Sequence, residues 1–147
     1  IVPKGNPEKV KGIEDLKDRS LRFINRQPGS GTRILFDYKL KALGISPSNI
    51  IGYDNDEYTH MSVAVSVLSG RVDAGLGIMA AANALNLDFI PVVTEEYDLI
   101  IPDRFLALRK IQILLETIKT DGFKKRIEFL GGYSTHRTGK IVFRTKQ

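Results

Sequence analysis

The chain has no cysteine, only two histidines, and no apolar run long enough to cross a membrane. The lack of cysteine excludes disulfides, thiolate metal sites and cysteine nucleophiles. The two histidines, His60 and His136, do not form the HExxH pair of a zinc hydrolase. Every apolar run is shorter than the roughly 18 residues that a membrane-spanning helix needs, and no signal-peptide pattern opens the chain. We therefore expect a cytoplasmic protein without a membrane segment.

Acidic residues are scarce at the C-terminal end, which accounts for the net charge of +5. Residues 119–147 hold eight Lys or Arg and two Asp or Glu, whereas residues 1–118 hold 14 basic and 15 acidic groups. Such a basic segment binds phosphate backbones in some proteins and is a solvated helix face in others. No aromatic stacking platform interleaves with the charges, so we do not expect nucleic acid as a partner.

The 147 residues, 42% of them apolar, are enough to bury a hydrophobic core. Apolar β-type runs alternate with helical patterns, which predicts an α/β fold with a mostly parallel sheet flanked by helices. The expected strands are 21–25, 50–53, 74–78, 89–93 and 97–101, and the expected helices are 34–43, 60–68, 105–118 and 123–130.

The stretch NRQPGSGTR, residues 25–33, falls between an expected strand and an expected helix. A glycine-containing turn at a helix N-terminus is a natural anion site, because free backbone amides and the positive end of the helix dipole converge there. Ser30 and Thr32 add hydroxyls, and Arg26 and Arg33 add fixed positive charge. Alternatively, Ser30 or Thr32 only caps the helix and the arginines face water.

Two nucleotide-binding motifs do not fit this turn. A dinucleotide fingerprint requires a third glycine where Ile34 stands. A P-loop requires Gly-Lys followed by Ser or Thr, but Gly139-Lys140 is followed by Ile141. We therefore expect no nucleotide cofactor.

The segment EYTHMS, residues 57–62, also follows an expected strand and opens an expected helix. Thr59 is the expected cap, and Tyr58, Thr59 and His60 could donate to the same ligand, although a capped helix with a surface histidine fits equally well. A calcium-binding EF-hand loop would need glycine at 59 and glutamate at 65, so no metal is expected. In the third expected strand, Gly75 and Gly77 permit close approach of a ligand or of a neighbouring backbone.

Signals for catalysis are weak. The chain has no G-x-S-x-G nucleophile elbow, and the hydroxyls of the two turns have no evident base partner in the sequence. Carboxylates such as Asp73, Glu95 and Glu96 could act as acids or bases, but at strand ends such groups are more often solvated or capping. These features favour a non-enzymatic binding module.

Several segments in the same order resemble a known domain. They are IVPKGNP, FINRQPGSGTR, GYDNDEYTH, SGRVDAGLGI, DFIPVVTEEYDLIIP and FLGGY. Together they resemble the periplasmic-binding-protein-like domain attached to molybdopterin-biosynthesis proteins and to molybdate-responsive regulators. They are more distantly similar to molybdate/tungstate and other type 2 solute-binding proteins and to the substrate-binding domains of LysR-type regulators.

This resemblance implies two α/β lobes joined by two crossover strands, with the ligand in the cleft between them. Residues 1–96 would form one ligand-binding lobe, and residues 97–147 the return crossover strand and the C-terminal helices of the other. It also assigns the site residues: Ser30, Gly31 and Thr32 as the anion turn, Gly77 and Ile78 as strand-end backbone contacts, Tyr97 as a hinge-side donor, and Arg26, Tyr58, Thr59 and His60 as residues flanking the cleft.

The resemblance implies a sensor for a small oxyanion such as molybdate or tungstate; a small organic anion or a pterin-linked phosphate remains open. The alternatives are a regulatory interaction domain without ligand and an accessory part of a molybdopterin-biosynthesis enzyme. The resemblance implies a further stretch before the first crossover strand in a complete domain, so we expect part of the second lobe to be missing from these residues. We therefore expect the C-terminal helices to expose an apolar face that pairs with a second copy or with a partner chain.

Overall fold

The computed structural model describes residues 1–18 and 20–145. The chain divides into two compact units, Ile1–Thr94 and Glu95–Gln147. We describe each unit separately.

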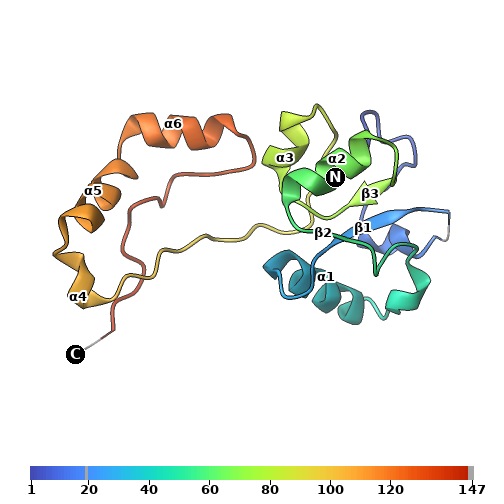
Figure 1. Ribbon diagram of the computed structural model, residues 1–147, viewed down its shortest axis with the longest axis horizontal. Helices are drawn as coiled ribbons and strands as arrows, with labels where there is room; N and C mark the ends of the chain where they lie inside the picture. Colours follow the sequence, from blue (N-terminus) through green and yellow to red (C-terminus); the bar gives the residue numbers. More distant parts are fainter. Residues whose placement is uncertain (19, 146–147) are drawn as a thin grey trace. The chain divides into compact units, whose positions relative to one another are not determined.

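The first unit is an α/β unit built on a three-stranded parallel sheet (Figure 1). Its elements in chain order are η1 (Ile13–Lys17), β1 (Phe23–Arg26), α1 (Gly31–Ala42), η2 (Pro47–Asn49), β2 (Asp56–Glu57), α2 (His60–Leu68), β3 (Ala74–Gly75) and α3 (Met79–Ala84). The strand order is β2-β1-β3, with Asn25 opposite Asp56 and Phe23 opposite Ala74. The small parallel sheet flanked by helices agrees with the predicted fold class.

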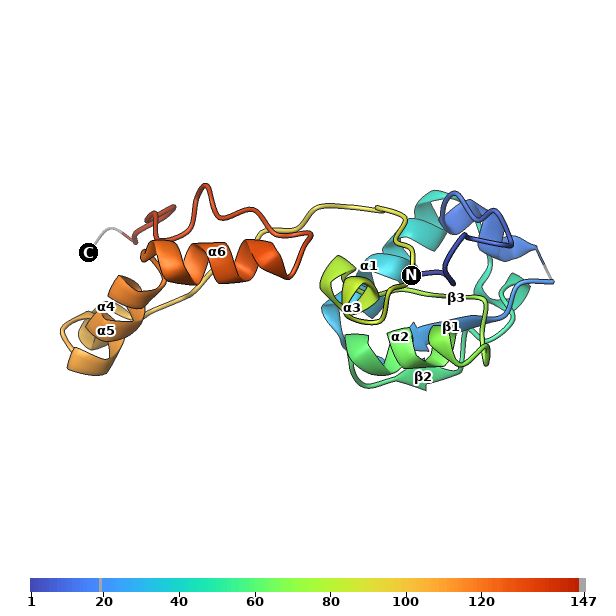
Figure 2. The ribbon, with the colours of Figure 1, turned by 90° about the horizontal axis from the view of Figure 1, so that it is seen from above.

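Helices cover both faces of β1, and this places two apolar clusters on opposite sides of the sheet. Neighbouring residues of a strand point to opposite faces. Phe23 packs with the helix α1 residues Phe36 and Leu40, and the Phe23 and Phe36 ring centroids are 4.8 Å apart. Ile24 packs with Val63 and other residues of α2 and α3. Figures 1 and 2 show α1 on one side of the sheet and α2 with α3 on the other. All four residues of β1 are consequently buried, as is usual for a parallel strand.

The second unit contains three helices, α4 (Asp103–Leu106), α5 (Arg109–Thr117) and α6 (Asp121–Phe129). Among its described residues only Thr135 is buried, and both apolar core clusters belong to the first unit. Its exposed apolar side chains include Ile113, Leu114, Phe129 and Leu130. None of the helices in the described part of the chain is long and apolar enough to span a membrane.

The helix predictions were right where caps and periodicity agreed. Helix α2 has the predicted bounds 60–68, and α1 begins at Gly31, three residues before the predicted start. The single helix predicted for 105–118 was wrong, because the chain forms two helices that meet at Ala107 and Leu108. Short elements such as α3 were missed, since its six residues, MAAANA, have no amphipathic pattern.

Four strand predictions were wrong in extent or existence. The strand predicted for 74–78 is shortened to β3, Ala74–Gly75. In the segment 50–53, Ile51 makes an isolated bridge with Arg22, and β2 lies further on at 56–57. The described residues of 89–93 and 97–101 form no strand. An extended apolar run forms a strand only where a neighbouring backbone offers hydrogen bonds, and here the nearest pairing is the bridge of Asp88 with Val2.

Gly52 holds the bend that leads from the Ile51 bridge toward β2. Its φ is +92°, and an added Cβ would lie 2.0 Å from the Phe23 carbonyl oxygen. Gly44 has a φ of +65° but has nothing within 4 Å of an added Cβ.

We predict that Gly52→Ala lowers the free energy of unfolding by roughly 3 kcal/mol or more, since strain and a backbone clash combine. Gly44→Ala is the control and should cost about 1 kcal/mol. Equal losses in urea unfolding would contradict this packing of Gly52 against β1.

Candidate functional site

The candidate site lies at the carboxyl edge of the sheet, where each of the three strands leads into a helix. Strand β1 leads into α1, β2 into α2, and β3 into α3. Because the strands are parallel, their carboxyl ends meet at one edge, and the helix N-termini follow there (Figure 2). The structure thereby brings together the predicted site residues that lie between 26 and 78.

The turn before α1 combines one capping hydroxyl with unpaired donors. Ser30 is the N-cap, and its Oγ accepts a hydrogen bond of 3.2 Å from the amide of Arg33. Within the described residues, the amides of Gly31 and Thr32 and the Thr32 hydroxyl have no recorded hydrogen-bond partner. Ser30 therefore does cap the helix, as the alternative interpretation held, while Gly31 and Thr32 keep donors free for a ligand.

Arg33 is directed toward its own helix and Tyr53. Its Nε lies 3.1 Å from Asp37 Oδ1, and its guanidinium carbon lies 4.2 Å from the centre of the Tyr53 ring. Another guanidinium nitrogen lies 3.4 Å from the carbonyl oxygen of Arg26. The Asp37 carboxylate thus balances much of the positive charge that the sequence suggested for an anion.

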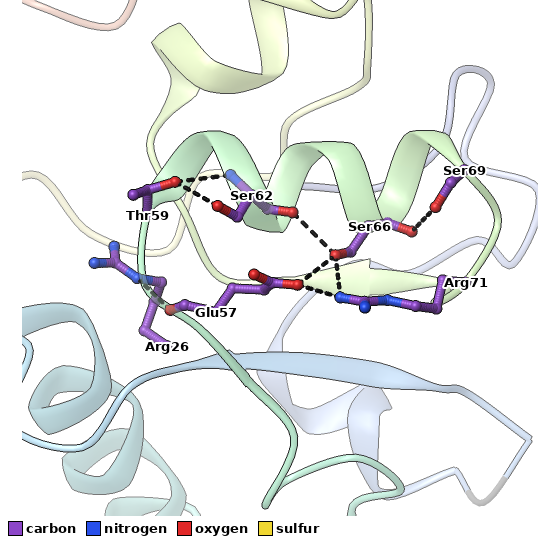
Figure 3. A network of polar contacts seen from close by, with 7 residues as sticks. All are labelled: Arg26, Glu57, Thr59, Ser62, Ser66, Ser69 and Arg71. Carbon is purple, nitrogen blue, oxygen red and sulfur yellow. Dashed lines mark hydrogen bonds and ion pairs between the residues drawn. The ribbon is translucent and has the colours of Figure 1, made fainter.

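The turn before α2 is held by Thr59 (Figure 3). Thr59 Oγ1 accepts a hydrogen bond of 2.9 Å from the amide of Ser62 and lies 2.6 Å from the Ser62 hydroxyl. The preceding Tyr58 side chain is 74% exposed, while His60 is half-buried at the first helical position. Thr59 is therefore the helix cap that the sequence predicted.

Arg26, the last residue of β1, is the charged group buried at this edge. Its side chain is bonded to the turn between β2 and α2, which Figure 3 shows passing in front of it. Nε donates to the carbonyl of Glu57 at 3.2 Å, and the terminal nitrogen Nη2 donates to the carbonyl of Tyr58 at 3.0 Å. The other terminal nitrogen, Nη1, lies 2.8 Å from His60 Nδ1 and 3.0 Å from Nε2. Only 7% of Arg26 is exposed, so the main role of its guanidinium is to link the end of β1 to the start of α2 through hydrogen bonds.

The electrostatics of this pair keep His60 uncharged. Burial lowers the pKa of His60, and the nearby charge of Arg26 lowers this pKa further. Burial also lowers the pKa of Arg26, but an arginine pKa starts so high that the side chain stays charged at neutral pH. At neutral pH the edge therefore holds one buried cation beside a neutral imidazole.

The carboxylate of Glu57 is directed away from Arg26, toward the middle of α2 (Figure 3). It pairs with Arg71 and lies 3.1 Å from the hydroxyl of Ser66, which Arg71 approaches at 2.5 Å. This role of Glu57 was not predicted from the sequence. Nor was that of Asn25, a fully buried residue whose side chain donates to the Tyr53 carbonyl at 3.0 Å and accepts from the Arg26 amide at 3.0 Å. A polar residue inside the apolar run FIN was the available signal for Asn25.

The remaining predicted site residues divide between the two units. At Gly77, an added Cβ would lie 2.7 Å from Ile1 Cδ1, the far end of a side chain that can shift, and 3.7 Å from His60 Nδ1, so the position is closely packed. Ile78 precedes α3 in an extended conformation. Tyr97 belongs to the second unit, where it is 95% exposed.

The carboxylates considered as acids or bases are engaged elsewhere. Arg22 and Asp73 lie at the amino ends of β1 and β3. Arg22 Nη2 donates to Asp73 Oδ1 at 2.6 Å and Nε donates to Oδ2 at 3.0 Å, and these bonds lower the pKa of Asp73. Glu96 pairs with Arg137 within the second unit. Across residues 1–18 and 20–145, no group of three or more His, Asp or Glu side chains could hold a metal ion.

Comparison with known proteins identifies the family. The family model of the PBP superfamily domain, the periplasmic-binding-protein-like fold, matches residues 1–119. The chain belongs to the PBP superfamily. The match includes the whole first unit and extends through α5 of the second.

Two relatives of this PBP-like chain are uncharacterised proteins. The chain is 38% identical over 148 aligned positions to YvgK of Bacillus subtilis, covering 98% of this chain and 46% of YvgK. It is 36% identical over 110 positions to a Clostridium pasteurianum protein encoded in the 5′ region of a 2Fe-2S ferredoxin gene, covering 74% of this chain and 97% of that protein. The chain thus spans about half the length of YvgK. No solved structure matches it significantly.

Membership of the PBP superfamily indicates a binding function. The site geometry is consistent with this, since the carboxyl edge of an open α/β sheet is where such folds bind ligands. In this PBP-like unit the Ser30 and Thr59 oxygens accept capping bonds, which leaves each hydroxyl its own O–H donor, and the amides of Gly31 and Thr32 remain open.

The cap of α2 can be tested by removing and restoring one hydroxyl. We predict that Thr59→Ala lowers the free energy of unfolding by about 1 kcal/mol, because the amide of Ser62 loses its partner. Thr59→Ser keeps the capping oxygen and should retain most of the stability. The measurement is urea unfolding of both variants beside the unaltered chain. A serine variant as unstable as the alanine variant would show that the methyl group matters and the cap does not.

Proposed function

We propose that this chain is a non-enzymatic binding domain for a small, fully ionised oxyanion such as molybdate or tungstate, acting in molybdenum-cofactor metabolism or its regulation. The observation that carries the proposal is the set of unpaired donors of Gly31 and Thr32 at the N-terminus of the 12-residue helix α1. They lie at the same sheet edge as the N-terminus of α2 and the buried Arg26. Amides, hydroxyls and a helix dipole stabilise negative charge without requiring a proton on the ligand.

The choice of molybdate or tungstate rests on the resemblance of the sequence motifs to molybdate-associated domains. The site geometry favours the wider class of tetrahedral oxyanions, which neutral donors bind well. Selection within this class requires the whole cleft, and a PBP-like cleft takes its second wall from the other lobe. The experiment must therefore compare several oxyanions.

The absence of catalysis is part of the proposal, and the edge supports it. The Ser30 and Thr59 oxygens are occupied by capping bonds from backbone amides, and His60 lies against Arg26. A hydroxyl nucleophile needs an adjacent base, and in the described structure His60 contacts Arg26 and no hydroxyl at this edge.

Thermal unfolding with and without anions tests the proposed ligand. We predict that millimolar molybdate or tungstate raises the unfolding midpoint more than sulfate or phosphate at constant ionic strength, because a ligand bound to the folded state stabilises it. Thr32→Val should weaken binding roughly 10- to 100-fold, since one hydrogen bond to a charged ligand is lost while the side-chain shape is kept.

The matched control is Thr138→Val, the same chemical change in the second unit. It should leave the anion response intact. The same midpoint with every anion would refute the oxyanion site. An unchanged response in Thr32→Val would instead remove Thr32 from that site.

We also propose that the second unit packs against a second copy or a partner chain that completes its lobe. The support is the lack of any buried apolar side chain among its described residues, together with exposed side chains such as Phe129 (90% exposed) and Leu130 (47%). Exposed apolar groups gathered on short helices are typical of interaction surfaces. This observation also favours the second candidate function, a regulatory interaction domain without ligand.

Light scattering tests the proposed association. We predict that the mass of the unaltered chain rises with concentration, and that Phe129→Asp shifts it toward one chain, because a charge is placed in the apolar contact. Lys124→Gln, an equal change of charge on the same helix, is the control. A single-chain mass at all concentrations without binding of a hydrophobic dye would mean that the chain covers these side chains itself, and the proposal would fail.

A further inference from the structure

The contact between Arg26 and His60 joins two side chains that can both carry a positive charge. One guanidinium nitrogen lies 2.8 Å and 3.0 Å from the two imidazole nitrogens. Arginine carries only N–H donors, and a protonated imidazole has an N–H at both nitrogens. A neutral imidazole has one lone-pair nitrogen, so at most one of the two contacts is a hydrogen bond, and the close positive charge of the guanidinium disfavours protonation of His60.

Arg26 is the fixed member of the pair. Its guanidinium is bonded to the carbonyl oxygens of Glu57 and Tyr58, and Nε also lies 3.3 Å from Gln27 Oε1. The side chain is buried, so the guanidinium cannot turn to water without leaving these carbonyls unpaired. Protonation of His60 must consequently move the imidazole and not the arginine.

Among the described residues, no carboxylate is recorded in contact with His60 to offset a proton. On the β1 side it meets Arg26, and on the β3 side it meets Gly77, which has no ionisable group. The Glu57 carboxylate, on the turn before α2, is paired with Arg71, and the nitrogen of Ile1 is bonded to the Gly75 carbonyl. His60 also occupies the first position of α2, where the helix dipole opposes a positive charge.

We propose that Arg26 is a positioning residue that keeps His60 neutral, and that anion binding at this edge is coupled to the uptake of one proton by His60. The coupling rests on the proposed function, whereas the Arg26–His60 contact does not. A bound oxyanion near Arg26 and the N-terminus of α2 supplies the negative charge that the free site lacks. His60 then becomes a second cation that shares the anion with Arg26.

The direction of the pH dependence follows from linkage. Burial and Arg26 lower the pKa of His60 in the free protein, and a neighbouring anion raises this pKa. Between the two pKa values, binding takes up one proton, so the affinity increases as the pH falls, by up to about tenfold per pH unit. Above the pKa of the bound form the affinity is independent of this group. Below the pKa of the free form it becomes independent again.

The first experiment needs no ligand. The chain has two histidines, so NMR titration of the imidazole signals of the full chain gives two midpoints, which His136→Gln assigns. We expect the His60 midpoint to lie below the ordinary pKa of a histidine, because burial and the charge of Arg26 both lower it. We expect Arg26→Gln, which keeps a donor but removes the charge, to raise the His60 midpoint, whereas Arg26→Lys keeps the charge and the low midpoint. A His60 midpoint that is the same in the unaltered chain and in Arg26→Gln overturns the positioning role.

The second experiment measures the affinity for sulfate and for molybdate between about pH 5.5 and 8, a range that spans the titration of histidine. The expected result is stronger binding at lower pH, together with a higher His60 midpoint in the presence of the anion. His60→Gln should abolish the pH dependence of whatever affinity remains. Constant affinity across the range, with binding intact, overturns the proton coupling alone. No binding of either anion at any pH overturns the proposed oxyanion site and the coupling together, while the first experiment still decides whether Arg26 positions His60.

Discussion

The buried guanidinium of Arg26 constrains the carboxyl edge of the sheet more than any other group. A cation enclosed in protein is stable only if its donors are paired, and the carbonyls of Glu57 and Tyr58 supply partners for two of its nitrogens. Those carbonyls belong to the turn that starts α2, so the end of β1 fixes where the second helix begins. Asn25 supports the arrangement from the preceding residue by accepting the Arg26 amide and donating to the Tyr53 carbonyl. The charge at the edge is therefore part of the framework that holds the two turns together.

The parts of the fold that the sequence predicted well depend on interactions between near neighbours. A capping hydroxyl and an apolar stripe lie within a few residues of each other, which is why α2 and its cap Thr59 were predicted, and why Ser30 was one of two capping candidates for α1. The strands at 89–93 and 97–101 failed because a strand also needs a distant partner, which local composition does not reveal. The same limit applies to the site. The sequence marked Arg26 as a free cation, but its bonds reach residues 31 to 34 positions away, and only the folded chain shows that they are made.

The two units differ in what stabilises them. In the first, β1 has an apolar cluster against each face, so burial of Phe23 and Ile24 orders the sheet and both layers of helices at once. The second has no such cluster among its described residues, and short helices such as α5 are marginal in water by themselves. The family match across residues 1–119 extends beyond the first unit, so helices α4 and α5 of the second unit belong to the same PBP-like domain.

At this edge a helix cap and a bound anion would both accept hydrogen bonds from the same groups, the backbone amides at a helix N-terminus. Capping occupies the acceptor capacity of Ser30 and Thr59 and satisfies the third amide of each helix, but it leaves the first two amides of α1 unpaired toward solvent. Because these amides belong to a helix that is already formed and anchored by buried Phe36 and Leu40, a ligand that accepts from them does not have to order the backbone first. Donors that are rigid before binding favour an anion of fixed shape over a flexible one. The proposed tetrahedral oxyanion meets this condition, since it is compact and of fixed shape and carries charge that a helix dipole can stabilise.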